Sequence, residues 1–159
     1  MINKKLLRIL FVLYLLTLLR VIVFKYPLER MKEIADSWRD DVFWEGMKKA
    51  NFEWFRTIQM YIRHWDNRGI NSFGNLIGNI LVFIPLGCML PLLGKVFKNI
   101  FLCLGTGLLL VLAIELFQLL TAFGCFDVDD ILLNGLGILI GYLIFKIVSC
   151  SSSKKRLTE

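Results

Sequence analysis

Four long apolar runs constrain the fold of this chain more than any other feature of its sequence. They cover residues 6–24, 74–93, 100–121 and 129–148. A helix needs about 20 predominantly apolar residues to cross the hydrocarbon core of a bilayer, and each run is close to that length. Because backbone polar groups inside lipid must be satisfied within the protein, we predict an all-α integral membrane protein with four transmembrane helices.

The composition supports a single membrane domain. Hydrophobic residues make up 57% of the 159 positions, and the mean hydropathy is +0.64, which is too apolar for a soluble domain of this length. The chain has one histidine and four scattered cysteines without a CxxC pair, so we expect no metal site, no other cofactor and no disulfide framework. We predict one domain over residues 1–148 and a basic cytoplasmic tail over residues 149–159.

The net charge of +6 is distributed as topology signals are. The basic residues without nearby acids form three clusters beside apolar runs: Lys4, Lys5 and Arg8; Lys95 and Lys98; and Lys154, Lys155 and Arg156. Four spans place all three clusters on one side of the membrane, which the positive-inside tendency makes the cytoplasmic side. We therefore predict a multi-pass membrane protein with both termini in the cytoplasm and no nucleic-acid partner.

The segment between the first two runs differs in composition, since it holds all the tryptophans: Trp38, Trp44, Trp54 and Trp65. Apolar residues recur at helical spacing opposite a charged face, which predicts an amphipathic helix over residues 41–66. Such a helix is expected to lie in the headgroup plane of the outer leaflet. We expect Trp44, Trp54 and Phe55 to face lipid or the bundle. A sharper interpretation makes this helix a lid over a polar pocket.

Uncommon polar side chains occur near the outer ends of the four runs. Placed with a helix rise of about 1.5 Å per residue, they fall at a similar depth: Arg20, Asn75, Asn79, Glu115, Gln118, Asp127, Asp130 and Asn134. Ionisable groups inside a membrane are costly and usually face a bundle interior, where they mark a functional site. The sequence therefore predicts an outward-facing polar pocket. The alternative is a network of hydrogen bonds between the helices, which we call a structural knot, that only holds the bundle together.

Arg20, within this cluster, and Asp129, beside it, each need a separate interpretation. Arg20 is either a side chain that snorkels to the interface or a counter-ion for a carboxylate on a neighbouring helix. Asp129 is offset from the helix face that carries Asp130 and Asn134. We therefore expect substitution of Asp129 to matter less than substitution of Asp130.

Two pairs of glycines at a spacing of four predict close contacts between helices. Gly74 and Gly78 begin the second run, and Gly137 and Gly141 lie within the fourth. Small residues at this spacing allow helix backbones to approach one another. The second pair can also join two copies of the chain in a homodimer.

Four short motifs follow one another from residue 75 onward. They are Asn75-xxx-Asn79, Phe83-Ile84-Pro85-Leu86-Gly87, Glu115-xx-Gln118 and Asp127-x-Asp129-Asp130-xxx-Asn134-xx-Gly137. In this order and spacing they resemble the VanZ-like family, which is named after a teicoplanin-resistance protein. The resemblance covers roughly residues 6–142. Many members of that family carry an arginine in the loop before the aspartates, where this chain has Gly124.

The resemblance implies a bacterial cell-membrane protein that lowers susceptibility to teicoplanin-type glycopeptide antibiotics. Such drugs carry a fatty chain and act at the outer leaflet on lipid-linked precursors of the cell envelope. The implied partners are a membrane lipid, a lipid-linked cell-wall precursor or the antibiotic itself. We favour a non-enzymatic role and assign no catalytic residue. An intramembrane enzyme acting on a lipid-linked substrate, with Glu115 as general base, and a small transporter are the alternatives.

Overall fold

The computed structural model describes residues 3–22, 28–36, 42–63 and 65–155. Within these ranges the chain is helical, with one isolated β-bridge and no strand, which confirms the predicted all-α class. The helices are α1 (Lys4–Ile22), α2 (Leu28–Asp36), α3 (Val42–Lys49), α4 (Arg56–Arg63), α5 (Trp65–Leu93), the 3₁₀ helix η1 (Lys95–Lys98), α6 (Ile100–Thr121) and α7 (Val128–Lys155).

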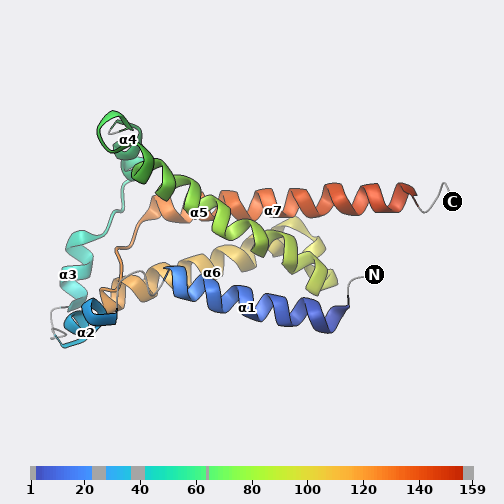
Figure 1. Ribbon diagram of the computed structural model, residues 1–159, viewed down its shortest axis with the longest axis horizontal. Coiled ribbons are helices and arrows are strands. Elements are labelled where there is room, and N and C mark those ends of the chain that lie inside the picture. The colour runs from blue at the N-terminus through green and yellow to red at the C-terminus, as the bar shows by residue number, and fades with distance from the viewer. Residues whose placement is uncertain (1–2, 23–27, 37–41, 64, 156–159) are drawn as a thin grey trace.

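The long helices run between two ends of an elongated molecule (Figure 1). The start of α1, the η1 turn and the end of α7 lie at one end. The short helices α2, α3 and α4 lie at the opposite end, together with the connection between α6 and α7 (Figure 1). Lys4, Lys5, Arg8, Lys95, Lys98, Lys154 and Lys155 therefore lie in elements at the first of these ends, and the connection that carries Asp127 lies at the second.

Three helices in the described part of the chain are long and apolar enough to cross a membrane. The qualifying segments are Gly74–Leu93 of α5, Ile100–Thr121, and Val128–Ser151 of α7. The first two coincide with the predicted runs, whereas α7 continues as a helix past residue 148 to Lys155. Helix α1 covers most of the predicted first span but carries four basic residues, and the last two positions of that span, 23–24, lie outside the described residues.

Glycines bring α5 and α7 into direct backbone contact. A Cβ atom on Gly137 would lie 2.2 Å from the carbonyl oxygen of Ile80, and one on Gly141 would lie 2.0 Å from that of Ile84. The close approach predicted for this pair therefore exists, but it is made to α5 of the same chain. The homodimer predicted through the same pair stays a prediction.

The other glycine pair has the opposite environment. A Cβ atom on Gly74 or Gly78 would meet no atom within 4 Å. The close helix contact expected at these positions is therefore wrong. Around these two glycines α5 is joined to its neighbours by the side chains of Asn75 and Asn79, which bond Tyr61 of α4 and Asp130 of α7.

The core lies where α5, α6 and α7 meet. Phe83, Val111 and Ile138 are each 0% exposed. The Tyr14 hydroxyl of α1 donates to the carbonyl oxygen of Val82 at 2.9 Å and joins α1 to α5. Within a bilayer such contacts stabilise the bundle by close packing and interhelical hydrogen bonds more than by removal of apolar surface from water.

The single amphipathic helix predicted over residues 41–66 is wrong, because α3 ends at Lys49 and α4 begins only at Arg56. Between them the backbone pairs with the start of α7. The Asn51 N–H donates to the Phe126 carbonyl at 2.8 Å, and the Val128 N–H donates to the Asn51 carbonyl at 3.1 Å. These tertiary bonds replace the helical ones. Positions 41 and 64 lie outside the described residues, as does Trp38.

Aromatic side chains in this segment face outward. Trp44, Trp54 and Phe55 are 63%, 59% and 54% exposed. They therefore do not pack into the bundle, which was one of the two positions expected for them. An exposed aromatic group of this kind is typical of the interface between lipid and water.

Candidate functional site

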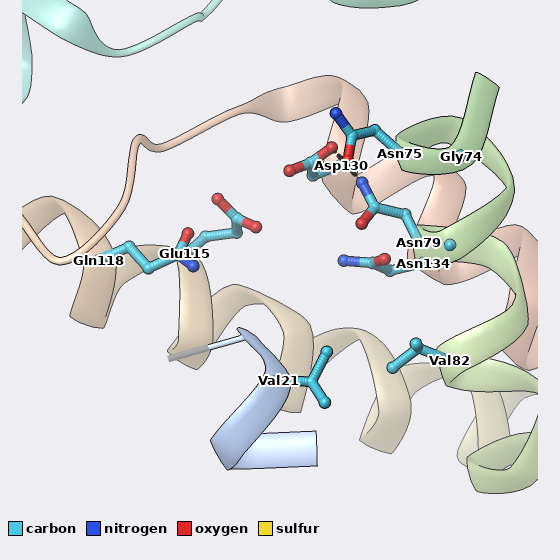
Figure 2. Close-up of a pocket in the computed structure, with 10 residues that line it drawn as sticks. Val21, Gly74, Asn75, Asn79, Val82, Glu115, Gln118, Asp130 and Asn134 are labelled. Carbon is cyan, nitrogen blue, oxygen red and sulfur yellow. Dashed lines mark hydrogen bonds between the residues drawn. The ribbon is translucent and has the colours of Figure 1, made fainter. Parts of the chain in front are cut away.

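A pocket of about 170 Å³ lies between α1, α5, α6 and α7 (Figure 2). Six of the polar residues predicted to converge line it: Asn75, Asn79, Glu115, Gln118, Asp130 and Asn134. The remaining wall consists of small or apolar residues: Val21, Gly74, Gly78 and Val82. An apolar cavity of about 150 Å³ holds benzene, so this pocket has room for a small headgroup or ring.

Helical spacing places the polar side chains on the walls of the pocket. Residues three or four apart share one face of a helix, and each of the three helices contributes one such pair. The α6 pair is deeply buried, with Glu115 2% and Gln118 7% exposed, and Asn134 of α7 is 4% exposed. The α6 wall and Asn134 are therefore removed from bulk solvent, whereas Asn79 and Asp130 are half-buried and Asn75 is exposed at the rim.

Hydrogen bonds connect the α5 wall to neighbouring elements. The Asn79 amide donates to a carboxylate oxygen of Asp130 and joins α5 to α7. The Asn75 amide donates to the Tyr61 hydroxyl of α4 at 3.3 Å. The rim of the pocket thus contacts α4, which belongs to the segment that the sequence interpreted as a lid.

One pocket residue is incompletely satisfied. The side-chain oxygen of Asn134 is buried and receives no hydrogen bond; among the described residues it is the one buried side-chain polar atom in this condition. Its amide group points from α7 into the space opposite Glu115 (Figure 2). A buried acceptor without a donor costs roughly 1–3 kcal/mol.

Arg20 and Asp127 are not among the residues that line the pocket. Arg20 is exposed in the last turn of α1, beside the lining residue Val21. The Asp127 backbone N–H donates to a carboxylate oxygen of Glu115 at 3.1 Å, so Asp127 is joined to the pocket through its main chain. Its carboxylate belongs to a second network.

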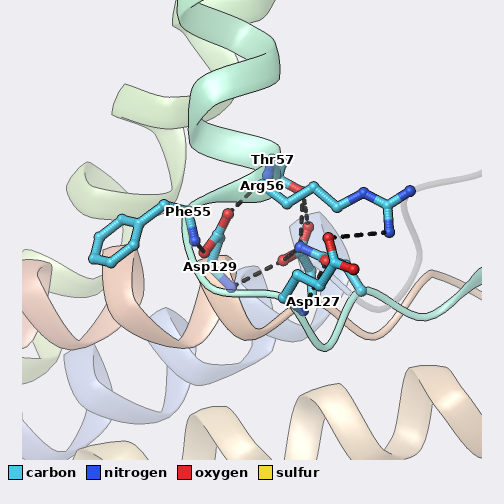
Figure 3. Close-up of polar contacts among 7 residues, drawn as sticks. Phe55, Arg56, Thr57, Asp127 and Asp129 are labelled. Atoms are coloured by element: carbon cyan, nitrogen blue, oxygen red, sulfur yellow. Dashed lines mark hydrogen bonds and ion pairs between the residues drawn. The ribbon is translucent and has the colours of Figure 1, made fainter.

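This second network, which we call the clamp, consists of Asn51, Thr57, Asp127 and Asp129 (Figure 3). The Asn51 amide donates to Asp127 at 2.8 Å, and the Thr57 hydroxyl donates to the other oxygen of the same carboxylate. The Asp129 N–H also donates to Asp127, at 2.8 Å. The clamp holds the segment between α3 and α4 against the first turn of α7.

Asp129 makes more hydrogen bonds to the segment between α3 and α4 than Asp127 does. It is 0% exposed and accepts three backbone N–H groups, from Phe55 at 2.6 Å, Thr57 at 2.8 Å and Ile58 at 3.1 Å. It therefore satisfies the donors that open α4, as a capping residue would. It is offset from the Asp130 face as predicted, but the minor role expected for it does not fit these contacts.

The clamp also holds a strained backbone. Phe55 has a φ of 64°, the left-handed conformation, which costs an L-residue with a Cβ roughly 1–2 kcal/mol. Its N–H bond to Asp129 offsets this cost. Asn51 and Thr57 were missed because the helical period passes through both of them; the available signal was that Asn and Thr favour caps and turns over helix interiors.

Gly124 lies in the connection between α6 and α7, three residues before Asp127. A Cβ atom here would lie 2.6 Å from the side-chain Cδ of Gln118. The Gln118 side chain therefore occupies the space that a larger residue at position 124 would need. Among the described residues no group of three or more His, Cys, Asp or Glu side chains is placed to hold a metal ion.

Comparison with known proteins matches the chain to a family model. No curated protein and no solved structure matches this chain. The sequence model of the VanZ/LLP1 family matches residues 11–149, which span α1 to α7 and include every residue of the pocket and the clamp. This chain is a member of the VanZ/LLP1 family.

Proposed function

We propose that this protein lowers the susceptibility of a bacterial cell to teicoplanin-type glycopeptide antibiotics by binding a lipid headgroup or the drug in the polar pocket. Membership of the VanZ/LLP1 family and three helices suited to a membrane support this role. The observation that carries the proposal is that six polar side chains from α5, α6 and α7 surround one cavity.

A purely structural knot is the competing interpretation of these polar side chains. In such a knot polar groups would fill one another's hydrogen-bonding capacity and leave little space. Here a cavity remains among them, and the Asn134 oxygen has no donor. Both features favour a site that receives a ligand.

The membrane arrangement that fits this function has four spans, including α1, with both termini in the cytoplasm. In Figure 1 the start of α1 and η1, which carry basic residues, lie at one end of the molecule. The end of α6 and the start of α7, which supply pocket residues, lie towards the other end, as this topology requires. A cysteine introduced at Ser72 is then labelled by an impermeant reagent in intact cells, and one at Lys98 is not. The reverse pattern would overturn the outward position of the pocket.

Expression in a susceptible Gram-positive strain tests the function. The wild-type chain is expected to raise the inhibitory concentration of teicoplanin, with vancomycin measured in parallel. Glu115→Gln keeps a carbonyl oxygen for the Asp127 N–H but removes one of the two carboxyl groups from the pocket. We expect it to abolish protection at unchanged membrane abundance. Full protection by Glu115→Gln at normal abundance contradicts the proposal.

A further inference from the structure

We propose that the turn between α3 and α4 is a lipid-binding surface, which presents aromatic side chains to the phospholipids at the surface of the bilayer. We call it the aromatic turn and define it by Phe52, Trp54 and Phe55. The inference goes beyond the proposed function and does not depend on the polar pocket. It rests on the identity of a strained residue, on the position of the turn beside two candidate spans, and on the separation of its apolar and charged sides.

The clamp requires a strained backbone at Phe55, but it does not require an aromatic side chain there. Phe55 has a φ of 64°, and Asp129 accepts its backbone N–H. Glycine or asparagine would supply the same N–H in this conformation with less strain. The phenylalanine ring is also exposed. Folding of the chain alone therefore does not favour phenylalanine at this position, and strain that persists in this way is typical of functional residues.

Ala122 provides a comparison, because it is the other residue besides glycine with a positive φ in the described part of the chain. It caps the C-terminus of α6, where a left-handed residue is common, and its side chain is a half-buried methyl group. The two residues share a backbone conformation, but of the two only Phe55 combines it with a large exposed ring. This difference indicates that the ring contacts something outside the chain.

The candidate spans of α5 and α7 both begin next to this turn. Asp129 is the second residue of the α7 segment that is apolar enough to cross a membrane, and it accepts the Phe55 N–H at 2.6 Å. Asn75 is the second residue of the corresponding α5 segment, and it donates to the Tyr61 hydroxyl of α4 at 3.3 Å. The stretch from Phe55 to Tyr61 is thus joined at both ends to points where a helix enters the apolar layer.

The exposed side chains of this stretch suit a lipid partner. No residue of α4 is buried, and Met60 and Ile62 are exposed together with the residues of the aromatic turn. Exposed apolar groups in such number mark contact with a protein or with a membrane. Their position beside the ends of two spans favours the membrane, because tryptophan and other aromatic residues are suited to the zone where a bilayer meets water.

The two sides of the turn differ in polarity. The Phe55 ring and the Arg56 guanidinium point to opposite sides (Figure 3). Arg56 forms an exposed ion pair with Glu53 at 3.9 Å, and such a pair keeps its contact with water. The turn therefore has a charged side for the aqueous phase and an aromatic side for lipid.

Tryptophan fluorescence of the full chain in phosphatidylcholine nanodiscs tests the location of the turn. The variant used retains Trp54, and phenylalanine replaces the other three tryptophans. Bromine atoms on the acyl carbons nearest the headgroup quench from the lipid side, and iodide quenches from water. We expect brominated lipid to quench Trp54. Quenching by iodide without quenching by brominated lipid overturns the proposal. Quenching by neither shows that protein, such as a second copy of the chain, covers the turn, and overturns it as well.

Two neighbouring substitutions assign lipid binding to the aromatic side. Phe55→Gln and Arg56→Gln introduce the same side chain on opposite sides of the turn. The readout is hydrogen exchange, in the same nanodiscs, of the Thr57 and Ile58 amides that Asp129 binds. Because burial of the ring in lipid favours the closed clamp, we expect Phe55→Gln to accelerate this exchange about tenfold. Arg56→Gln removes an exposed ion pair and should change the exchange much less.

The two measurements together separate lipid binding from a role of Phe55 inside the chain. Faster exchange in Phe55→Gln without quenching of Trp54 by brominated lipid would mean that the ring packs within the protein, and overturns the proposal. An equal change of exchange in the two variants also overturns it, since the aromatic side would then contribute nothing of its own. Neither result bears on the proposed function, because Phe55 and Arg56 do not line the pocket.

Discussion

Asp129 and Asp130 occupy consecutive positions in the first turn of α7, but they serve two regions with different properties. Asp129 belongs to the clamp, where its carboxylate is fully buried and accepts three backbone N–H groups. Asp130 belongs to the pocket, where it accepts from Asn79 and borders an open cavity with an unsatisfied acceptor. The carboxylate is fully buried and bonded to backbone donors in one region, whereas in the other it is half-buried at the edge of a cavity.

The surroundings of each carboxylate distinguish the clamp from the pocket better than its depth in the membrane does. Both regions lie at the same end of the bundle, and both contain deeply buried carboxyl groups. In the clamp the donors come from a segment of the chain that the carboxylates hold in place. In the pocket, the Asn134 oxygen has no donor and part of the volume remains open.

The largest expected effect comes from Asp129→Asn in the clamp. The substitution removes the charge and replaces one acceptor oxygen by an NH₂ group, which opposes the backbone donors of Thr57 and Ile58 or of Phe55. We expect a loss of about 3 kcal/mol in stability, since charge-assisted bonds are lost and a buried donor is left unpaired. Hydrogen exchange at these three amides should accelerate, and membrane abundance should fall. Unchanged exchange would show that Asp129 does not hold the segment.

A smaller effect is expected from Thr57→Val, which keeps the shape of the side chain and removes the hydroxyl that bridges Asn51 and Asp127. We expect a loss of about 1 kcal/mol, measured as a lower midpoint of denaturation in detergent. Thr106→Val in α6, an exposed position outside the clamp, is the control and should change the midpoint less.

The smallest effect on stability is expected in the pocket, from Asn134→Leu. Replacing an unsatisfied buried acceptor by an apolar group of similar size is nearly neutral or stabilising. We expect the denaturation midpoint to remain or rise while antibiotic protection falls. A marked drop in the midpoint would mean that the Asn134 amide stabilises the bundle. The pocket would then have a structural role, as the clamp does.

The sequence predicts the pocket better than the clamp, for a physical reason. The pocket residues lie three or four positions apart on uninterrupted helices, so helical geometry alone aligns Asn75 with Asn79 and Asp130 with Asn134. The clamp depends on bonds between residues about seventy positions apart, such as Thr57 to Asp129. These bonds stop a helix that the local period of residues 41–66 would continue.

The glycines show a similar limit. The spacing of Gly74 and Gly78 is the same as that of Gly137 and Gly141, but only the second pair contacts another backbone. The spacing of the glycines indicates which face of a helix carries small residues. It does not indicate whether a helix or an open space lies opposite that face, because this depends on where α5 crosses α7.

Membrane abundance and teicoplanin protection, measured together for Asp130→Asn and Asp129→Asn, test the account most directly. The two variants make the same chemical change at neighbouring positions, so each is the control for the other. We predict that Asp130→Asn accumulates normally and loses protection, whereas Asp129→Asn accumulates poorly and keeps its protection per molecule. Full protection by Asp130→Asn at normal abundance, or an equal loss of abundance in both variants, would contradict the distinction between a ligand pocket and a structural clamp.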